Sequence, residues 1–146
     1  MAAADSEAGA KGALRVEIVT PQGLVLDETA DALYAPGTKG EFGALPGHQP
    51  YLVALEPGPV RVQRGGSDDW YAITGGLAEV TANHVIVLAD ACEQARDIDA
   101  DRAKAAQKRA DDRLRDFAKD SDVDTRRARA ALARATARLG AANRAG

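Results

Sequence analysis

The distribution of glycine and proline divides this chain of 146 residues into two unlike parts. Up to Asp97, turn-forming residues recur at short intervals, whereas beyond it no glycine occurs before Gly140 and no proline occurs at all. Because glycine and proline interrupt helices, long helices are possible only in the last third of the chain. The first part must therefore fold as short elements joined by turns.

Short apolar runs between these turns predict strands. Leu14, Val16 and Ile18 alternate with polar residues, which is the period of two of a half-buried strand. Further runs occupy residues 24–26, 32–35, 51–55, 60–64, 70–74, 77–81 and 85–88. The turn signals between them lie at residues 21–23, 36–37, 57–59, 65–66, 75–76 and 82–83. Most are too short for a crossover helix, so residues 14–96 are expected to form a mainly antiparallel β-sandwich or barrel.

Residues 97–146 predict two amphipathic helices. Asp99 can cap the first helix and Asp124 the second, with a polar break at residues 119–122 and Gly140 where a C-terminal cap belongs. The short break favours an antiparallel hairpin. Its apolar seams consist of Ala103, Ala106, Ala110, Leu114 and Phe117 in the first helix, and Ala128, Ala131, Leu132, Ala135 and Leu139 in the second. Because alanine buries little area, we expect the hairpin to be marginally stable alone and to change position.

The expected fold class is α+β, an N-terminal antiparallel β-sandwich followed by a C-terminal antiparallel two-helix hairpin. Residues 1–13 are small and acidic, unlike a secretory signal or a transit peptide, and are expected to be a disordered tail. The longest apolar runs are far shorter than the ~20 residues needed to cross a bilayer. The single cysteine, Cys92, has no partner for an internal disulfide, which agrees with a reducing compartment.

Charge is unevenly distributed between the two parts. Residues 1–96 hold six Lys/Arg and thirteen Asp/Glu, whereas residues 97–146 hold thirteen and nine, although the whole chain has a net charge of only −3. This asymmetry suggests two parts with different partners. Arg127, Arg134 and Arg138 lie near one face of the second helix, where a solvated cationic face is the simpler interpretation. No aromatic residues interleave them for base stacking, so a nucleic-acid partner is not expected.

Catalytic and metal-binding motifs are not recognisable in the sequence. His48 and His84 are far apart and no paired Cys or His spacing occurs, so a metal site is not expected. The serines do not stand in a nucleophile motif, and glycines 37, 40, 43 and 47 do not form a phosphate-binding loop. An interaction protein is therefore favoured over an enzyme.

Three stretches of the sequence resemble the epsilon subunit of bacterial F-type ATP synthase. They are residues 16–23, residues 40–50 (GEFGALPGHQP) and residues 74–93 (TGGLAEVTANHVIVLADACE), in the order and at the spacing of that family. Since the helical tail also agrees, the resemblance covers nearly all of residues 14–139. It implies a flattened β-sandwich followed by a two-helix hairpin, in agreement with the independent prediction.

The resemblance implies a non-catalytic rotor subunit, because catalysis in this family belongs to the alpha and beta subunits. The sandwich would bind gamma and sit on the ring of c subunits. The helices would extend along gamma, reach alpha and beta, and block ATP hydrolysis. The chain would require no cofactor and would contact the membrane only through the complex, at the cytoplasmic face of the bacterial inner membrane.

The resemblance also carries site residues onto this chain. The loop of residues 41–48 faces the c ring in the family, which makes Glu41 and His48 candidate contacts. An alternative for His48 is a histidine buried or hydrogen-bonded within its own turn. Some bacterial members bind regulatory ATP through an I/L-D-x-x-R-A motif, which residues 98–103 reproduce. The candidate ATP-binding residues are Glu93, Ile98, Asp99, Arg102, Ala103, Arg109, Arg134 and Arg138.

Other interpretations stay open at this point. Asp99 is also an ordinary helix cap. The whole chain is alternatively a free-standing β-sandwich protein-binding module with a helical oligomerisation tail. An autonomous ATP-hydrolysing enzyme is a further alternative, although the phosphate-binding loop of such enzymes is missing from the sequence.

Overall fold

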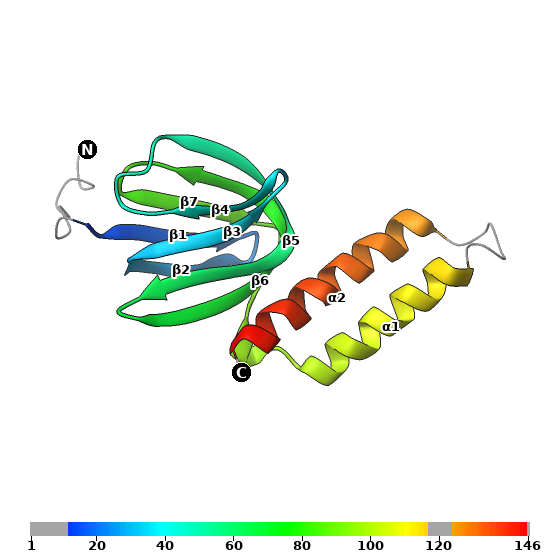
Figure 1. Ribbon diagram of the computed structural model, residues 1–146. Helices are drawn as coiled ribbons and strands as arrows, with labels where there is room; N and C mark the ends of the chain where they lie inside the picture. The colour runs from blue at the N-terminus through cyan, green and yellow to red at the C-terminus, as the bar shows by residue number, and fades with distance from the viewer. Residues whose placement is uncertain (1–11, 117–123, 146) are drawn as a thin grey trace.

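A computed structural model describes residues 12–116 and 124–145 as a flattened β-sandwich from which two helices project (Figure 1). This arrangement confirms the expected α+β class. The strands are β1 Leu14–Thr20, β2 Gly23–Ala30, β3 Ala32–Gly37, β4 Gly40–Ala44, β5 Tyr51–Arg64, β6 Ser67–Val80, β7 His84–Ala89 and β8 Cys92–Gln94. A short 3-10 helix, Ala95–Asp97, leads into α1, Ala100–Asp116, and then α2, Thr125–Ala145. The expected N-terminal tail lies outside the described residues, apart from Gly12 and Ala13. Phe117 of the first helical seam and the expected break at residues 119–122 also lie outside them.

The strand order is β2-β1-β7-β6-β5-β3-β4, with β8 paired to β6. Every adjacent pair is antiparallel except β1 and β7, which run parallel. The prediction that the strands pair mainly antiparallel is confirmed. The expected fold class named an antiparallel sandwich, and the parallel pair of β1 and β7 corrects that part of it. A parallel pair needs a long connection, and here the five strands from β2 to β6 provide it.

The turns expected at residues 57–59 and 75–76 are wrong. β5 and β6 pass through both segments as one long hairpin, in which Leu55 pairs with Gly76 and Pro57 pairs with Thr74. The register is the same on both sides of these two pairs, so both strands bend together there without a bulge (Figure 1). Gly76 has a φ of 141°, and a Cβ at this position would lie 1.9 Å from the carbonyl oxygen of Leu88. These glycines and prolines therefore form a corner of the sandwich instead of reversing the chain.

The core lies between the two layers of the sandwich and is aliphatic. Alternate residues of β1 point into it, as the period of two predicts, and Leu14, Val16 and Ile18 are fully buried. The other largest fully buried side chains are Leu33, Val60, Val62, Ile73, Val80, Val85 and Val87. Valine and isoleucine pack well on a pleated sheet, so this core needs few aromatic residues.

The two helices form the expected antiparallel hairpin, and both expected N-caps are confirmed. Asp99 Oδ1 accepts a hydrogen bond from the backbone N–H of Arg102 at 3.1 Å, and Asp124 Oδ1 accepts one from Arg127 at 3.0 Å. Neither helix has the length and hydropathy that crossing a bilayer requires, as far as the described residues go.

The helix end expected at Gly140 is wrong, because α2 continues to Ala145. The last turns of α2 rest on β5 and β6, where Ala141 is fully buried against Ala72 and Ala95. This tertiary contact offsets the ~1 kcal/mol that an internal glycine costs a helix. The rest of the hairpin points away from the sandwich (Figure 1).

Candidate functional site

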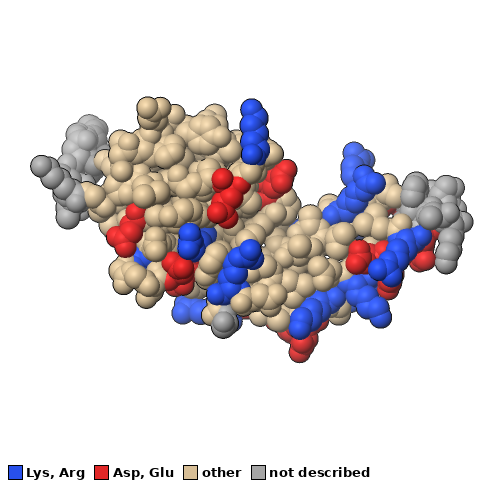
Figure 2. All heavy atoms as spheres, viewed as in Figure 1, with Lys and Arg blue, Asp and Glu red and all other residues tan. Residues whose placement is uncertain are grey.

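The candidate nucleotide-binding residues surround the junction between the hairpin and the sandwich. Glu93 belongs to β8, and Ile98 and Asp99 lie between the 3-10 helix and α1. The remaining candidates are Arg102, Ala103 and Arg109 on α1, and Arg134 and Arg138 on α2. In the space-filling view the middle of the hairpin is tan, and basic and acidic side chains lie along its edges (Figure 2).

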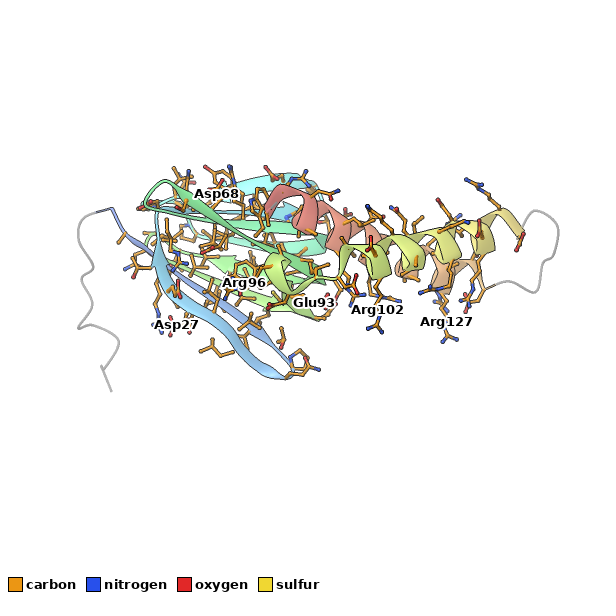
Figure 3. All side chains as sticks on the ribbon, turned by 90° about the horizontal axis from the view of Figure 1, so that it is seen from below. Asp27, Asp68, Glu93, Arg96, Arg102 and Arg127 are labelled. Carbon is orange, nitrogen blue, oxygen red and sulfur yellow. The ribbon has the colours of Figure 1, made fainter. Side chains whose placement is uncertain are left out.

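Helical geometry brings the four candidate arginines to one side of the hairpin. On the opposite side, Gln107 Nε2 of α1 donates a hydrogen bond to Thr136 Oγ1 of α2 at 3.2 Å. At 100° per residue, Arg102 and Arg109 lie on the flank of α1 away from Gln107. By the same rotation, Arg134 and Arg138 lie on the flank of α2 away from Thr136. Arg102 and Arg127 project on this common side in Figure 3.

An ion pair links this basic side to the sandwich. Arg138 Nε donates to Glu93 Oε2 at 2.5 Å, and both side chains are partly exposed. Glu93, Arg134 and Arg138 line one pocket of about 260 Å³ between the sandwich and α2. Cys92 lines the same pocket, and burial raises the pKa of its thiol to about 12. The structure therefore brings three of the eight candidates into one pocket.

The other candidates make contacts of their own. Ile98 packs against the small cluster of Ala72, Ala95 and Ala141. Ala103 is buried, and Asp99 caps α1. Arg102 and Arg109 are exposed on α1, where they flank the pocket without lining it.

Sequence reasoning missed an aromatic and cationic cluster at the same junction. The guanidinium carbon of Arg61 lies 4.1 Å from the ring centroid of Tyr34 and 5.8 Å from that of Trp70. The guanidinium carbon of Arg144, in the last turn of α2, lies 5.5 Å from the Trp70 ring. The available signal was the single tryptophan of an aromatic-poor chain.

The expected c-ring loop is partly a strand. Glu41 is exposed within β4, so the expectation of a continuous loop over residues 41–48 is wrong. β4 pairs with β3, which leaves only residues 45–50 as the connection to β5. His48 fits the alternative interpretation of a histidine hydrogen-bonded within its own turn, because its Nδ1 lies 2.5 Å from the carbonyl oxygen of Gln49. Its ring centroid lies 6.3 Å from that of Tyr51.

The outer face of the sandwich carries an apolar row that crosses five strands. Pairing places Ala54 opposite Leu77, Leu77 opposite Leu88, Leu88 beside Val19, and Val19 opposite Leu24. Directly paired residues share a face of a sheet. The side chains of Leu77, Leu88 and Leu24 are 46%, 50% and 60% exposed. We call these five residues the apolar row.

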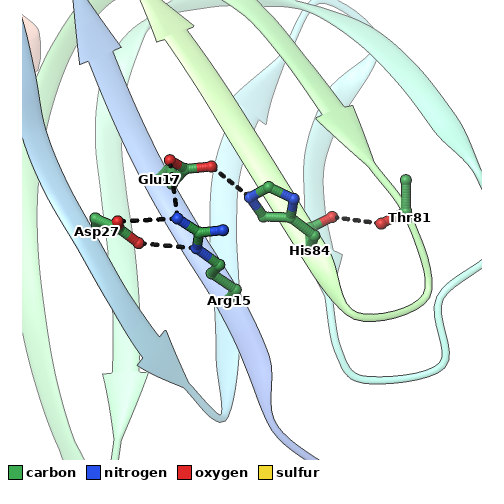
Figure 4. A network of polar contacts seen from close by, with 5 residues as sticks. All are labelled: Arg15, Glu17, Asp27, Thr81 and His84. Carbon is green, nitrogen blue, oxygen red and sulfur yellow. Dashed lines mark hydrogen bonds and ion pairs between the residues drawn. The ribbon is translucent and has the colours of Figure 1, made fainter. Parts of the chain in front are cut away.

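Figure 4 shows a polar network on β1, β2 and β7. It lies beside the apolar row, because Arg15 and Glu17 alternate along β1 in phase with Val19 and so share its face. Arg15 donates from Nε and Nη2 to the two carboxylate oxygens of Asp27, each at 3.0 Å, and this pairing lowers the pKa of Asp27. Glu17 receives Arg15 Nη2 at 3.4 Å and lies 2.5 Å from His84 Nε2. Thr81 Oγ1 donates to the backbone oxygen of His84 at 3.1 Å. The network ties β2, β1 and β7 together across the face.

No metal site emerges from residues 12–116 and 124–145, where no group of three His, Cys, Asp or Glu side chains is placed to hold an ion.

Both parts of the chain match models of known protein domains. Residues 13–95 match the ATP synthase delta/epsilon chain beta-sandwich domain, and residues 96–143 match the long alpha-helix domain of the same chains. The chain belongs to the ATP synthase delta/epsilon chain family. The resemblance seen in the sequence is thereby confirmed.

Individual relatives agree with this family. An ATP synthase epsilon chain of Anaeromyxobacter sp. (strain Fw109-5) is 44% identical over 132 residues, which are 90% of this chain and 99% of the relative. The epsilon chain of Desulforamulus reducens is 46% identical over 109 residues, covering 75% of this chain and 83% of that one. Since these relatives are epsilon chains, the expectation of a non-catalytic ATP synthase subunit is confirmed.

Solved structures share the fold at low identity. A chain of the Euglena gracilis mitochondrial ATP synthase structure containing OSCP, F1 and the c-ring superposes with a TM-score of 0.74 at 24% identity. That match covers 88% of this chain and 81% of the other. A chain of the Tetrahymena thermophila mitochondrial central stalk and c-ring gives a TM-score of 0.51 at 17% identity, covering 73% and 94%.

Proposed function

We propose that this chain is a central-stalk rotor subunit of a proton-translocating F-type ATP synthase. It binds gamma and the c ring, couples rotation to ATP synthesis, and inhibits ATP hydrolysis through its C-terminal helices. It works at the cytoplasmic face of the bacterial inner membrane and touches the membrane only through the complex. The observation that carries this proposal is the exposed apolar row on the sandwich of an epsilon-family chain.

The apolar row is the proposed docking surface for gamma. Leu77 and Leu88 face each other on β6 and β7 and leave about half of each side chain in water. Contiguous apolar surface of this kind on a soluble domain marks a protein interface. The polar network of Arg15, Glu17 and Asp27 borders the row and would form the polar rim of the interface.

A pulldown with purified gamma tests this surface. Leu77→Asp and Leu88→Asp are expected to weaken gamma binding at least tenfold, because each would bury an unpaired carboxylate. Leu45→Asp is the matched control, since Leu45 is a similarly exposed leucine in the β4–β5 connection. Full gamma binding by both row variants would contradict the proposal. Absence of gamma binding by the unaltered chain would favour the free-standing binding module with a helical oligomerisation tail.

The β4–β5 end of the sandwich is the proposed contact with the c ring. Glu41 is exposed and held by the pairing of β4 with β3, so it can present its carboxylate rigidly. His48 is partly engaged within its own turn and contributes less. A cysteine replacing Glu41 is expected to cross-link to the ring in the assembled complex, and one replacing His48 more weakly. Cross-linking at neither position would remove this assignment.

Regulatory ATP is proposed to bind on the basic side of the hairpin. Arg134 and Arg138 share a pocket with Glu93, and Arg102 and Arg109 flank it on the same side. Four guanidinium groups along one side suit a triphosphate, which they would bind by charge-assisted hydrogen bonds. Since Glu93 now holds Arg138, ATP must compete with that ion pair and compensate for its loss by bridging α1 and α2. ATP at ~100 times its dissociation constant would favour the folded hairpin by ~2.7 kcal/mol.

Titration calorimetry of the chain with millimolar ATP tests this site. Arg134→Ala is expected to weaken ATP binding about tenfold, because it removes charged hydrogen bonds worth roughly 1.5–3 kcal/mol. Arg129→Ala is the control, since helical rotation puts Arg129 on the other flank of α2. A heat signal that Arg134→Ala leaves unchanged, or the lack of any heat with the unaltered chain, would dispose of the site.

Inhibition is proposed to require the helices to leave the sandwich and reach alpha and beta. ATPase assays of the complex, with the full chain or with residues 1–96 alone, test this step. Removing residues 97–146 is expected to raise ATP hydrolysis without loss of gamma binding. Unchanged hydrolysis would mean that the helices do not inhibit.

A further inference from the structure

The hairpin rests on the sandwich through small residues. Ala141 is fully buried against Ala72 and Ala95, and a Cβ added to Gly140 would lie 3.8 Å from the ring of Pro59. Residues this small remove little apolar area from water, at ~0.8 kcal/mol per buried methylene. Packing alone therefore holds α2 weakly, and polar contacts must decide how firmly it docks.

Two arginines of α2 supply such contacts, six residues apart. Arg138 Nε donates to Glu93 Oε2 on β8 at 2.5 Å. Arg144 presents its guanidinium group to the Trp70 ring on β6 at 5.5 Å, which is within cation–π range. Arg144 Nη1 also donates to the backbone oxygen of Gly140 at 3.0 Å. That bond restrains the Arg144 side chain near Trp70.

The sandwich side of the Trp70 contact is itself braced. Arg61 lies 5.8 Å from the Trp70 ring and 4.1 Å from the Tyr34 ring, and its Nη1 lies 3.5 Å from Asp68 Oδ2. Trp70 is partly buried against the alanine cluster. The ring that receives Arg144 is therefore held in place by β3 and β5.

We propose that Arg138 with Glu93 and Arg144 with Trp70 form a two-point latch that holds the hairpin on the sandwich. Losing either contact lowers the docked population, and losing both releases α2. An exposed ion pair and a partly exposed cation–π contact each change an equilibrium by roughly two- to fivefold. The latch is therefore adjustable. It acts within the chain alone, so its failure would leave the proposed gamma and c-ring contacts untouched.

The chain contains its own reporter of docking, because Trp70 is its single tryptophan and lies in the latch. Arg144→Ala is expected to shift tryptophan emission to longer wavelength in the isolated full chain. Amide exchange in residues 134–145 should accelerate roughly two- to fivefold. Arg138→Ala should give a comparable acceleration, and the double variant about the product of the two. Exchange within β5 and β6 should stay slow, which would show that the sandwich remains folded.

Two control variants separate the latch from general charge effects. Arg126→Ala removes an exposed arginine about five turns earlier on the same helix and should change neither emission nor exchange. Arg144→Lys keeps the charge but loses the planar group that stacks on an aromatic ring, so it should fall between the unaltered chain and Arg144→Ala. Arg126→Ala acting as strongly as Arg144→Ala would overturn the proposal.

A disulfide supplies the decisive rescue. Cys92 and Ala137 line one pocket between β8 and α2, and a disulfide from Ala137→Cys to the natural cysteine is expected to lock the docked state. In the chain carrying both Arg144→Ala and Ala137→Cys, oxidation should restore slow exchange in residues 134–145, and reduction should abolish it. Arg144→Ala and Arg138→Ala with emission and exchange identical to those of the unaltered chain would refute the latch.

Discussion

Gly76 is a position at which the backbone leaves no room for a side chain. Its φ is 141°, and an added Cβ would collide with the backbone of Leu88, which cannot move without breaking the β6–β7 pairing. Gly76→Ala is therefore expected to destabilise the sandwich by about 3 kcal/mol in urea denaturation. Gly66→Ala is the matched control, because Gly66 also has a positive φ but has no atom within 4 Å of an added Cβ. Equal losses at the two glycines would contradict the steric argument.

Cys92 makes a second prediction at the residue scale. Burial raises the pKa of its thiol to about 12, so little reactive thiolate forms near neutral pH. Alkylation at pH 8 is expected to be roughly a thousandfold slower than for an open cysteine of pKa about 8.5. The rate should continue to rise about tenfold per pH unit through pH 10, as measured by mass spectrometry of iodoacetamide adducts. A plateau near pH 9 would show that the thiol is open to solvent.

At the scale of elements, the sequence predicted periodicity well and long-range packing poorly. The alternation of Leu14, Val16 and Ile18 located β1, and Asp99 and Asp124 located both helix starts, because caps and periods are local properties. The glycines and prolines of residues 57–59 and 75–76 predict turns, although the two strands bend together there. Only the pairing of β5 with β6 distinguishes a turn from a shared bend, and that pairing joins residues well separated in the sequence, such as Pro57 and Thr74.

The same limit applied to the candidate site. Arg134 and Arg138 were located by helical spacing and motif, but Trp70 and Arg144 were not, because 74 positions separate them in the sequence and tertiary packing alone brings them together. The prediction of a helix end at Gly140 is wrong for the same reason. Tertiary contact with β5 and β6 carries α2 past it.

The helices should show graded stability along their length. The last turns of α2 rest on the sandwich, whereas the rest of the hairpin points away and has an alanine-rich seam (Figure 1). Amide exchange is therefore expected to be slowest at residues 134–145 and faster at residues 100–116 and 125–133, because isolated helices of this length are marginal. Uniform protection along both helices would contradict the docking geometry.

At the scale of the whole molecule, charge should favour docking. Residues 97–146 carry four more basic than acidic side chains, whereas residues 1–96 carry seven more acidic than basic ones. Raising the salt concentration from about 10 mM to about 1 M shortens the screening length from roughly 30 Å to 3 Å. Trp70 emission is therefore expected to move to longer wavelength as sodium chloride is added. In the disulfide-locked chain the emission should stay constant, and an identical response there would mean that salt acts on the ring directly.

The parallel pairing of β1 with β7 also bears on how the chain is made. Val16 of β1 meets Val85 of β7, so the sheet closes only after nearly all of the sandwich has left the ribosome. Until then, the nascent chain exposes one edge of β1, and an exposed strand edge invites pairing with other chains. Contacts so distant in sequence also slow folding. A ribosome stalled before His84 should therefore present a sandwich that is sensitive to proteases and chaperones, and one stalled well beyond Ala89 should not.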